Sequence, residues 1–226
     1  MRNLISSFSG IISVSDINKR YCVEKLRVPE NKIRVFPNTI NTDIFFQRDK
    51  KIMRKKYNFP QEKFIIVFVG HFIERKGPLR VLSALNNLEE DICAIFIGKG
   101  VQKPKGEKVL FVDSVSHAII PELLSTGDVF VLPTLNEGSC NAIAEAMACG
   151  LPIITSNIDA IKEQVDSENS ILCNPLNTDE IKNAISLLYN NRFLTEKMAK
   201  KSLEIASKFT LKDRANQIKK YLINMY

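Results

Sequence analysis

Residues 128–150 decide the fold, and they read DVFVLPTLNEGSCNAIAEAMACG. The apolar run 129–132 ends at a proline, which is typical of a short strand buried on both faces. A polar turn with Glu137 follows and leads into a predicted helix, which Ser139 caps and which carries Glu145. A buried strand that passes through a polar turn into a helix is the repeating unit of a parallel α/β sheet.

The same alternation of strands and helices runs through the rest of the chain. Predicted strands cover 64–69, 92–97, 109–112, 129–132, 152–155 and 171–173, and predicted helices cover 78–88, 117–126, 140–148, 160–165, 178–190, 194–207 and 211–224. This pattern predicts an α/β fold, a doubly wound, Rossmann-like parallel sheet with right-handed crossovers and closing C-terminal helices. We divide the chain into residues 1–45, a binding domain over 46–195 and C-terminal helices over 196–226.

Two polar segments follow strands at the sheet edge where helices begin. Free amide groups and the positive end of the helix dipole favour an anion at that edge. Near the predicted strand 64–69 the candidate binding residues are Gly70, His71, Arg75 and Lys76, and after the strand 129–132 they are Gly138, Ser139, Cys140 and Asn141. Two cations together with backbone amides can neutralise a diphosphate in place of a divalent metal.

Glu137 and Glu145 flank this predicted anion site. A carboxylate accepts hydrogen bonds from two vicinal hydroxyls at once, which suits Glu145 to a ribose. Glu137 precedes the helix and would face the other side of the phosphate, where an attached sugar would project. The two carboxylates therefore predict a nucleotide carrying a sugar.

The stretch from Glu137 to Glu145, EGSCNAIAE, resembles the E-x7-E motif of the retaining GT-B glycosyltransferases of family 4, also called group 1. The segment 70–77 resembles that family's G-R-x-x-x-x-K-G pattern, with His71 where arginine is common. Gly98, which opens the run Gly98-Lys99-Gly100, resembles the family's G-x-G turn beneath the nucleotide. The resemblance implies a GT-B C-terminal domain for this chain.

The resemblance also implies the roles of the site residues. Lys76 would stabilise the leaving diphosphate, Glu137 would orient the sugar, and Glu145 would hold the ribose. Arg75 would compensate for His71, which stands where the family commonly has arginine. Catalytic work would fall to Glu137, Lys76 and Arg75, and donor binding to Gly70, His71, Gly98, Gly138, Ser139, Cys140, Asn141 and Glu145. The implied enzyme transfers a hexosyl unit from a UDP- or GDP-linked sugar to a hydroxyl of a glycan or lipid-linked glycan, with retention.

Neither a cofactor nor a metal is implied, since the nucleotide sugar is a substrate and the sequence has no D-x-D. The two histidines, His71 and His117, have no cysteine or carboxylate at ligand spacing. These observations weigh against the metal-dependent GT-A enzymes. A hydrolase is also disfavoured, because EGSCN is not a nucleophile elbow.

The resemblance covers only about the second half of a family member. Residues 1–45 would then be the tail of the N-terminal acceptor domain and its linker, with a helix end before residue 11, strands over 11–14 and 33–36 and a helix over 16–26. We expect the isolated chain to bind donor and to transfer slowly or not at all. The alternatives are a subunit of a split transferase with an N-terminal-domain partner chain, a non-catalytic nucleotide-sugar-binding module, and an epimerase or phosphorylase of this architecture.

Composition limits the remaining choices. The chain has 226 residues, of which 45% are hydrophobic and 25% charged, as in ordinary globular domains. The net charge of +7 suits a polyanionic ligand or an anionic membrane surface, while no basic strand or helix with interleaved aromatics predicts a nucleic-acid partner. Five scattered cysteines without a C-x-x-C predict reduced, mostly buried thiols and a cytoplasmic location. The lipid-linked acceptors that are frequent in the resembled family, together with the basic charge, imply peripheral contact at the inner membrane face.

Overall fold

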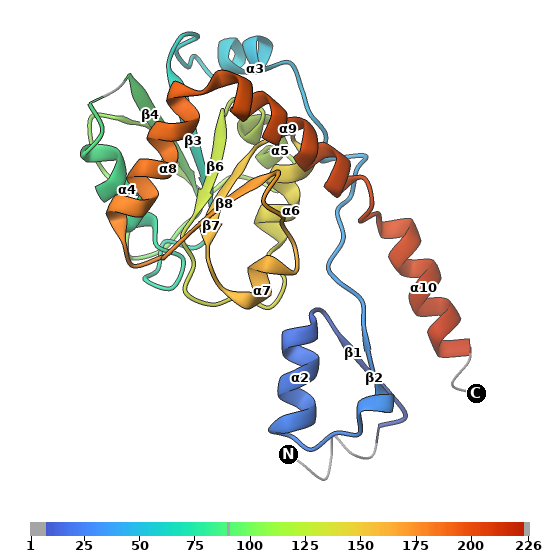
Figure 1. Cartoon of the computed structure of the whole chain (residues 1–226). Helices are drawn as coiled ribbons and strands as arrows, with labels where there is room; N and C mark the ends of the chain where they lie inside the picture. Colours follow the sequence, from blue (N-terminus) through green and yellow to red (C-terminus); the bar gives the residue numbers. More distant parts are fainter. Residues whose placement is uncertain (1–7, 90, 224–226) are drawn as a thin grey trace.

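Six parallel strands form the main sheet of the computed structural model, which describes residues 8–89 and 91–223 (Figure 1). They lie in the order β5-β4-β3-β6-β7-β8. Their bounds are β3 (Phe64–Val69), β4 (Ile92–Ile97), β5 (Val109–Asp113), β6 (Val129–Leu132), β7 (Ile153–Ser156) and β8 (Ser170–Cys173). The predicted doubly wound parallel sheet is confirmed, and each strand lies within one residue of its expected bounds.

The central strands are buried on both faces, which explains their unbroken apolar sequences. Every residue of β3, β4 and β6 is buried. Aromatic side chains fill much of this core, and the rings of Phe68 and Phe96 pack with their centroids 5.7 Å apart. Such strands have no polar face, so the alternating pattern of a half-buried strand is absent from their sequences.

Helices cover both faces of the sheet (Figure 1). They are α3 (Lys50–Lys56), α4 (Pro78–Asn86), α5 (Ile120–Leu124), α6 (Asn141–Ala148), α7 (Asp159–Lys162), α8 (Thr178–Asn190) and α9 (Arg192–Ala206). α4 packs beside α8 and α5 beside α6, and right-handed crossovers place these two pairs on opposite faces. The predicted bounds of α5 and α7 were too long, since α5 begins only beside Pro121, a residue suited to the first helical turn.

The chain reverses its direction across the sheet beside β3. From β3 it moves outward through β4 to β5 and then returns to the other side of β3 as β6. The loops after β3 and β6 therefore diverge at their carboxyl ends. In an open parallel sheet this reversal is where ligands bind.

The first part of the chain forms a small separate unit below the main sheet in Figure 1. β1 (Ile11–Ser13) pairs in parallel with β2 (Ile33–Val35), and α2 (Asp16–Glu24) and a short 3-10 helix (Glu30–Lys32) connect them. The C-terminal helix α10 (Leu211–Ile223) returns to this unit. There the hydroxyl of Tyr221 donates to the carbonyl of Lys32 at 3.2 Å. The helix end expected before residue 11 falls mainly on residues 1–7, outside the described residues.

The linker after β2 is part of the main core rather than a free connection. Ile40 and Phe45 are only 3% and 2% exposed. The amide of Ile40 donates to the carbonyl of Phe209 at 3.0 Å, at the predicted break between the last two helices. Ile40 and Phe45 thus anchor the linker in the main core.

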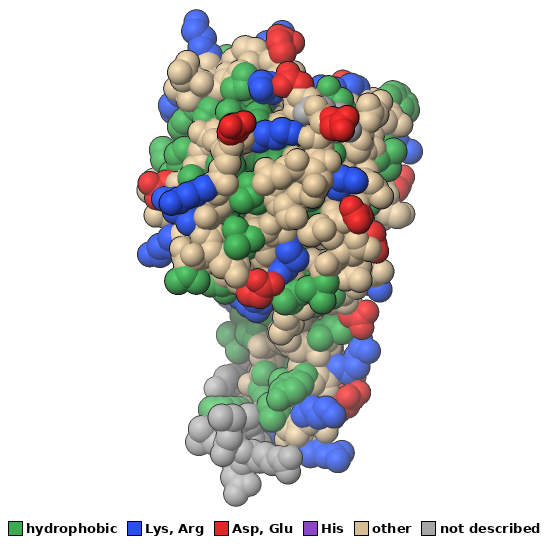
Figure 2. All heavy atoms as spheres, turned by 90° about the vertical axis from the view of Figure 1, so that its left-hand side faces the viewer, with side chains coloured by type: hydrophobic (Ala, Val, Ile, Leu, Met, Phe, Trp, Pro, Cys, Tyr) green, Lys and Arg blue, Asp and Glu red, His purple; other side chains and the backbone are tan. Residues whose placement is uncertain are grey.

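Positively and negatively charged side chains are mixed on the side of the molecule where α4 lies. Figure 2 shows this side, where lysine and arginine side chains alternate with aspartate and glutamate. Within residues 8–89 and 91–223, no helix is both long enough and apolar enough to cross a membrane. Four of the five cysteines are buried and all five are unpaired, as the sequence predicted.

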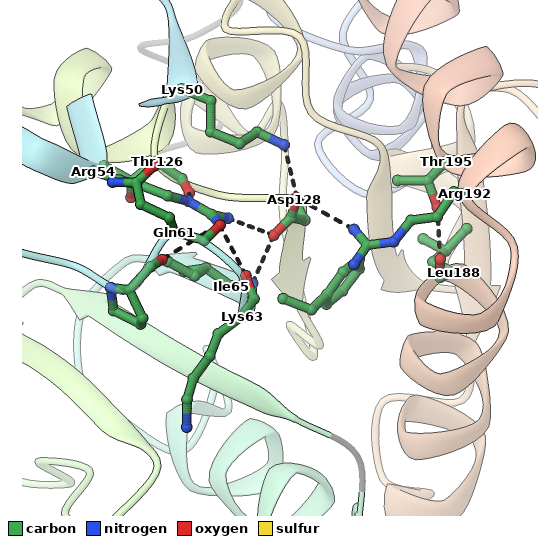
Figure 3. A network of polar contacts seen from close by, with 12 residues as sticks. Lys50, Arg54, Gln61, Lys63, Ile65, Thr126, Asp128, Leu188, Arg192 and Thr195 are labelled. Atoms are coloured by element: carbon green, nitrogen blue, oxygen red, sulfur yellow. Dashed lines mark hydrogen bonds and ion pairs between the residues drawn. The ribbon is translucent and has the colours of Figure 1, made fainter. Parts of the chain in front are cut away.

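Asp128, at the start of β6, is the centre of the largest buried ion-pair network (Figure 3). Its carboxylate accepts from the guanidinium of Arg54 at 2.6 Å, from Lys50 at 2.7 Å and from the amide of Ile65 at 2.7 Å. Arg192 lies 3.7 Å away. The network ties β6 to β3, α3 and α9, and Asp128 is only 6% exposed.

Replacing Asp128 with asparagine should lower the free energy of unfolding by roughly 3–5 kcal/mol, because the charge of buried Arg54 loses its carboxylate. Urea denaturation measures the change. The matched control is Asp91→Asn, which removes an exposed pair with Lys63. Comparable losses in the two variants would contradict the central role of the Asp128 network.

Candidate functional site

The loops after β3 and β6 meet through an ion pair between Lys76 and Glu137. Both groups are largely withdrawn from water, with side chains 15% and 9% exposed. Thr134, fully buried at the end of β6, donates its hydroxyl to the same oxygen of Glu137 at 2.8 Å. The structure therefore brings a cation and a carboxylate from different loops together at the point where the chain reverses.

Arg75 stands beside this pair with its side chain 45% exposed. Its guanidinium donates to the carbonyl of Asn136 at 2.7 Å and lies 3.7 Å from the carboxylate of Glu137. The backbone carbonyl of Arg75 accepts from the amide of Leu135 at 2.8 Å. These bonds fasten the two loops, so Arg75, Lys76 and Glu137 form one cluster. His71 lies exposed in the same loop, outside this network.

Gly98 supports the loop after β3 from below. It has a φ of +153°, and a Cβ there would overlap the carbonyl oxygen of Gly70. The amide of Gly70 in turn donates to the carbonyl of Ile97 at 3.0 Å. The glycine therefore allows two strand ends to approach backbone to backbone, which fixes where the chain carries Arg75 and Lys76.

The start of α6 differs from the prediction. Cys140 rather than Ser139 is the N-cap residue, and its side chain makes no capping hydrogen bond. The side chain of Gln164 caps the helix instead, because its Oε1 accepts a hydrogen bond from the amide of Cys140 at 2.7 Å. The hydroxyl of Ser139 accepts from the amide of Asn38 at 3.4 Å. The predicted Ser139 cap was wrong, and the amide of Cys140 is already occupied.

Asn38 and Gly138 connect this turn to the first part of the chain. The side-chain amide of Asn38 donates to the carbonyl of Ser139 at 3.2 Å and to Oδ1 of Asn141 at 2.9 Å. Gly138 lies against Asn18 of α2, whose Nδ2 would be 2.8 Å from a Cβ at that glycine. The polar turn is thus held between the linker and α2.

Cys140 has no thiolate character. Burial, and then the charge of Glu137, raise the pKa of its thiol to about 11. The thiol is consequently protonated at neutral pH and cannot act as a nucleophile.

Glu145 lies on α6 with its side chain 14% exposed. Burial raises the pKa of its carboxyl, and the neighbouring His117 partly lowers it. Nε2 of His117 is 3.2 Å from Oε1 of Glu145. A buried carboxylate with so little compensation is typical of a binding or catalytic site.

Sequence reasoning missed Thr134, Gln164 and the contact between His117 and Glu145. Thr134 directly follows Pro133 at the end of a predicted strand, so its position was a usable signal. Gln164 and His117 reach the site from other parts of the chain, and their spacing gives no signal. Among the described residues, no three His, Cys, Asp or Glu side chains are grouped as a metal site.

A hollow of about 550 Å³ lies at the opposite edge of the sheet, beside the Asp128 network. Ser125 and Cys149, the C-caps of α5 and α6, line it. Helix C-termini carry partial negative charge and disfavour a phosphate. We therefore assign the site to the carboxyl ends of the strands and not to this hollow.

Comparisons with known proteins show the family and the fold. The model for glycosyl transferases group 1 matches residues 49–205, more than half of the chain. The chain belongs to this family. One relative is the UDP-Gal:alpha-D-GlcNAc-diphosphoundecaprenol alpha-1,3-galactosyltransferase of Escherichia coli, which is 28% identical over 95% of this chain and 60% of its own length.

Solved structures show the same fold. The sucrose-phosphate synthase of Thermosynechococcus elongatus superposes with a TM-score of 0.89 at 20% identity, over 99% of this chain and 60% of that one. HepE of Anabaena in complex with UDP-glucose superposes with a TM-score of 0.87 at 20% identity, over 98% of this chain and 66% of that one. The fold is that of the C-terminal half of a GT-B glycosyltransferase, and the chain spans about 60% of the length of the E. coli relative.

Replacing Gly98 with alanine should lower the free energy of unfolding by about 1–3 kcal/mol, because the new Cβ forces the two strand-end loops apart. Chemical denaturation measures this. Gly106→Ala is the matched control, since the nearest atom to a Cβ there is 3.6 Å away. Equal stabilities for the two variants would show that the close approach of Gly98 to Gly70 is dispensable.

Replacing Glu145 with glutamine should raise the stability near neutral pH. Because burial raises the pKa of Glu145 in the folded state, the stability it contributes is present below the unfolded value, near 4.5, and is lost as the pH rises through the folded value. Glutamine removes that loss. The gain in unfolding free energy should shrink as the pH falls toward about 4.5, and a gain that is independent of pH would contradict this account.

Proposed function

We propose that this chain binds the nucleoside diphosphate sugar in a retaining hexosyl transfer to a hydroxyl of a glycan or lipid-linked glycan. The observation that carries the proposal is the joining of Lys76 and Glu137 where the chain reverses across the sheet, with Glu145 on the helix that follows. One cation and two carboxylates suit a diphosphate, a sugar and a ribose.

Lys76 and Glu137, the two members of the buried pair, each have a role when the donor binds. A diphosphate draws the ammonium of Lys76 toward its oxygens, with Arg75 beside it. Glu137 is then free to accept hydrogen bonds from sugar hydroxyls while Thr134 keeps its carboxylate in place. Negative charge that develops on the leaving diphosphate meets cations already in position, which lowers the barrier without reorganisation.

The identity of the donor is proposed from the relatives. The E. coli relative is named for UDP-Gal and a diphosphoundecaprenol acceptor, and HepE was solved with UDP-glucose. We therefore favour a UDP-linked hexose over a GDP-linked one. A lipid-linked acceptor would place the reaction at the cytoplasmic face of a membrane, with the protein bound peripherally.

A second candidate is the donor-binding subunit of a split transferase. β1 and β2 form only a two-stranded parallel pair, and Ile12 and Tyr21 in this unit are 41% and 58% exposed. A pair of strands this small needs further packing for stability. In that case, an N-terminal-domain partner chain would supply the acceptor side.

Calorimetric titration with UDP, GDP, ADP and their common hexose conjugates tests donor binding. We expect one nucleotide to bind, and expect Glu145→Gln and Lys76→Met to weaken it by roughly 10- to 100-fold, as when a charged hydrogen-bond partner is lost. Lys105→Ala and Glu107→Gln are matched controls in the exposed loop that precedes β5. Since Glu145→Gln should not destabilise the fold at neutral pH, lost binding there would not reflect unfolding.

An assay of sugar transfer from the bound nucleotide sugar to glycan and lipid-linked acceptors distinguishes the remaining candidate functions. Product formation by the chain alone supports a complete transferase. Binding without transfer supports a donor-binding subunit or module, and addition of a partner chain distinguishes these two. Failure of the well-folded chain to bind any nucleotide would refute the proposed function.

A further inference from the structure

His117 lies in the loop between β5 and α5, and its ring reaches across to Glu145 on α6. Nε2 of the ring lies 3.2 Å from Oε1 of that carboxylate. The edge of the ring contacts Phe45, with centroids 5.0 Å apart and planes inclined at 64°. Because Phe45 is only 2% exposed within the core, it gives the imidazole a rigid wall.

Glu145 depends on this one contact. Within residues 8–89 and 91–223, His117 provides the only polar side chain in contact with the Glu145 carboxylate, whose side chain is only 14% exposed. A buried carboxylate with a single partner relies on that partner for its orientation and for part of its charge compensation. The histidine itself stays 63% exposed, so solvent protons reach it.

The other ionisable groups nearby do not share this role. Arg48 donates to the carbonyls of Ile44 at 3.0 Å and Phe46 at 3.1 Å. Burial raises the pKa of Cys149, one turn further along α6, to about 12, so this thiol stays neutral. Phe45, on the linker, carries no charge. Among the described residues, His117 is thus the one whose side chain contacts the Glu145 carboxylate.

We propose that His117 is a positioning residue for nucleotide recognition, whose imidazole holds the Glu145 carboxylate toward the ribose and helps to keep that carboxylate ionised. The inference rests on the proposed function, in which Glu145 receives the ribose. No bond is made or broken by His117, and its effect is exerted through Glu145.

Two substitutions distinguish the orienting hydrogen bond of His117 from its charge. His117→Ala removes both, whereas in His117→Gln the side-chain amide still donates a hydrogen bond but cannot become positively charged. Without the imidazolium, Glu145 takes up a proton at higher pH and loses its ability to accept from both ribose hydroxyls. Acid should therefore weaken nucleotide binding more steeply in both variants than in the natural chain.

The experiment is calorimetric titration of the full chain with UDP and GDP between about pH 5.5 and about pH 8, across the range in which histidine titrates. At the upper end we expect His117→Ala to bind about tenfold more weakly, the effect of one orienting hydrogen bond to a charged group, and His117→Gln to restore most of the affinity. At the lower end both variants should lose a further several-fold relative to the natural chain. Glu107→Gln is the control that should follow the natural pH profile.

The outcomes are distinct from those that test the proposed function. If the natural chain binds and Glu145→Gln abolishes binding, but both His117 variants keep the natural affinity and pH profile, the inference is overturned and the proposed function stands. Equal weakening of both variants at every pH, without rescue by glutamine, would also overturn it, since that is the signature of a merely structural residue. No binding by the natural chain would overturn both.

Discussion

The carboxylate of Asp128 holds β6 against β3, and the geometry of the candidate site depends on this contact. It accepts the amide of Ile65 at the start of β3 and the guanidinium of Arg54 from α3. β3 and β6 are the two strands between which the chain reverses, and they share only a short register of paired residues. At the other end of the same strands, Lys76 and Glu137 face one another. Fixing the amino ends of two short strands fixes the separation of the loops at their carboxyl ends.

Two buried carboxylates on neighbouring elements illustrate opposite uses of burial. Asp128 accepts hydrogen bonds from two cations and a backbone amide, and a third cation, Arg192, lies nearby, so its desolvation is offset and the result is a rigid joint. In the described part of the chain, Glu145 has only the imidazole of His117 as a polar side-chain partner, and burial raises the pKa of its carboxyl. A carboxylate that burial destabilises in the ligand-free protein is stabilised when a ligand supplies hydroxyl donors. The fold therefore uses full compensation where it needs stiffness and partial compensation at the proposed ribose site.

The strands could be predicted because each is a continuous apolar run, and burial on both faces leaves no competing pattern. Arg75, Lys76 and Glu137 could be placed together because carboxyl ends of parallel strands share one edge. The cap of α6 could not be predicted, since Gln164 reaches the amide of Cys140 from a different crossover and caps the helix in place of the adjacent Ser139. The partner of Glu145 could not be predicted for a similar reason. His117 is 28 residues earlier in the chain, and only the packing of α5 on α6 brings the two together.

The same long-range bonds determine how the first part of the chain meets the site. Both carboxylate oxygens of Glu163 accept from the first amides of α2, those of Asp16 at 2.9 Å and Ile17 at 3.0 Å. These are exposed hydrogen bonds, and water replaces such bonds at a small net cost. By contrast, Ile40 and Phe45 of the linker are buried in the main core. The linker is therefore the firm attachment and the contact with α2 the weak one. Any relative movement of the two parts would separate α2 from Glu163 and Gly138 while Phe45 keeps His117 beside Glu145.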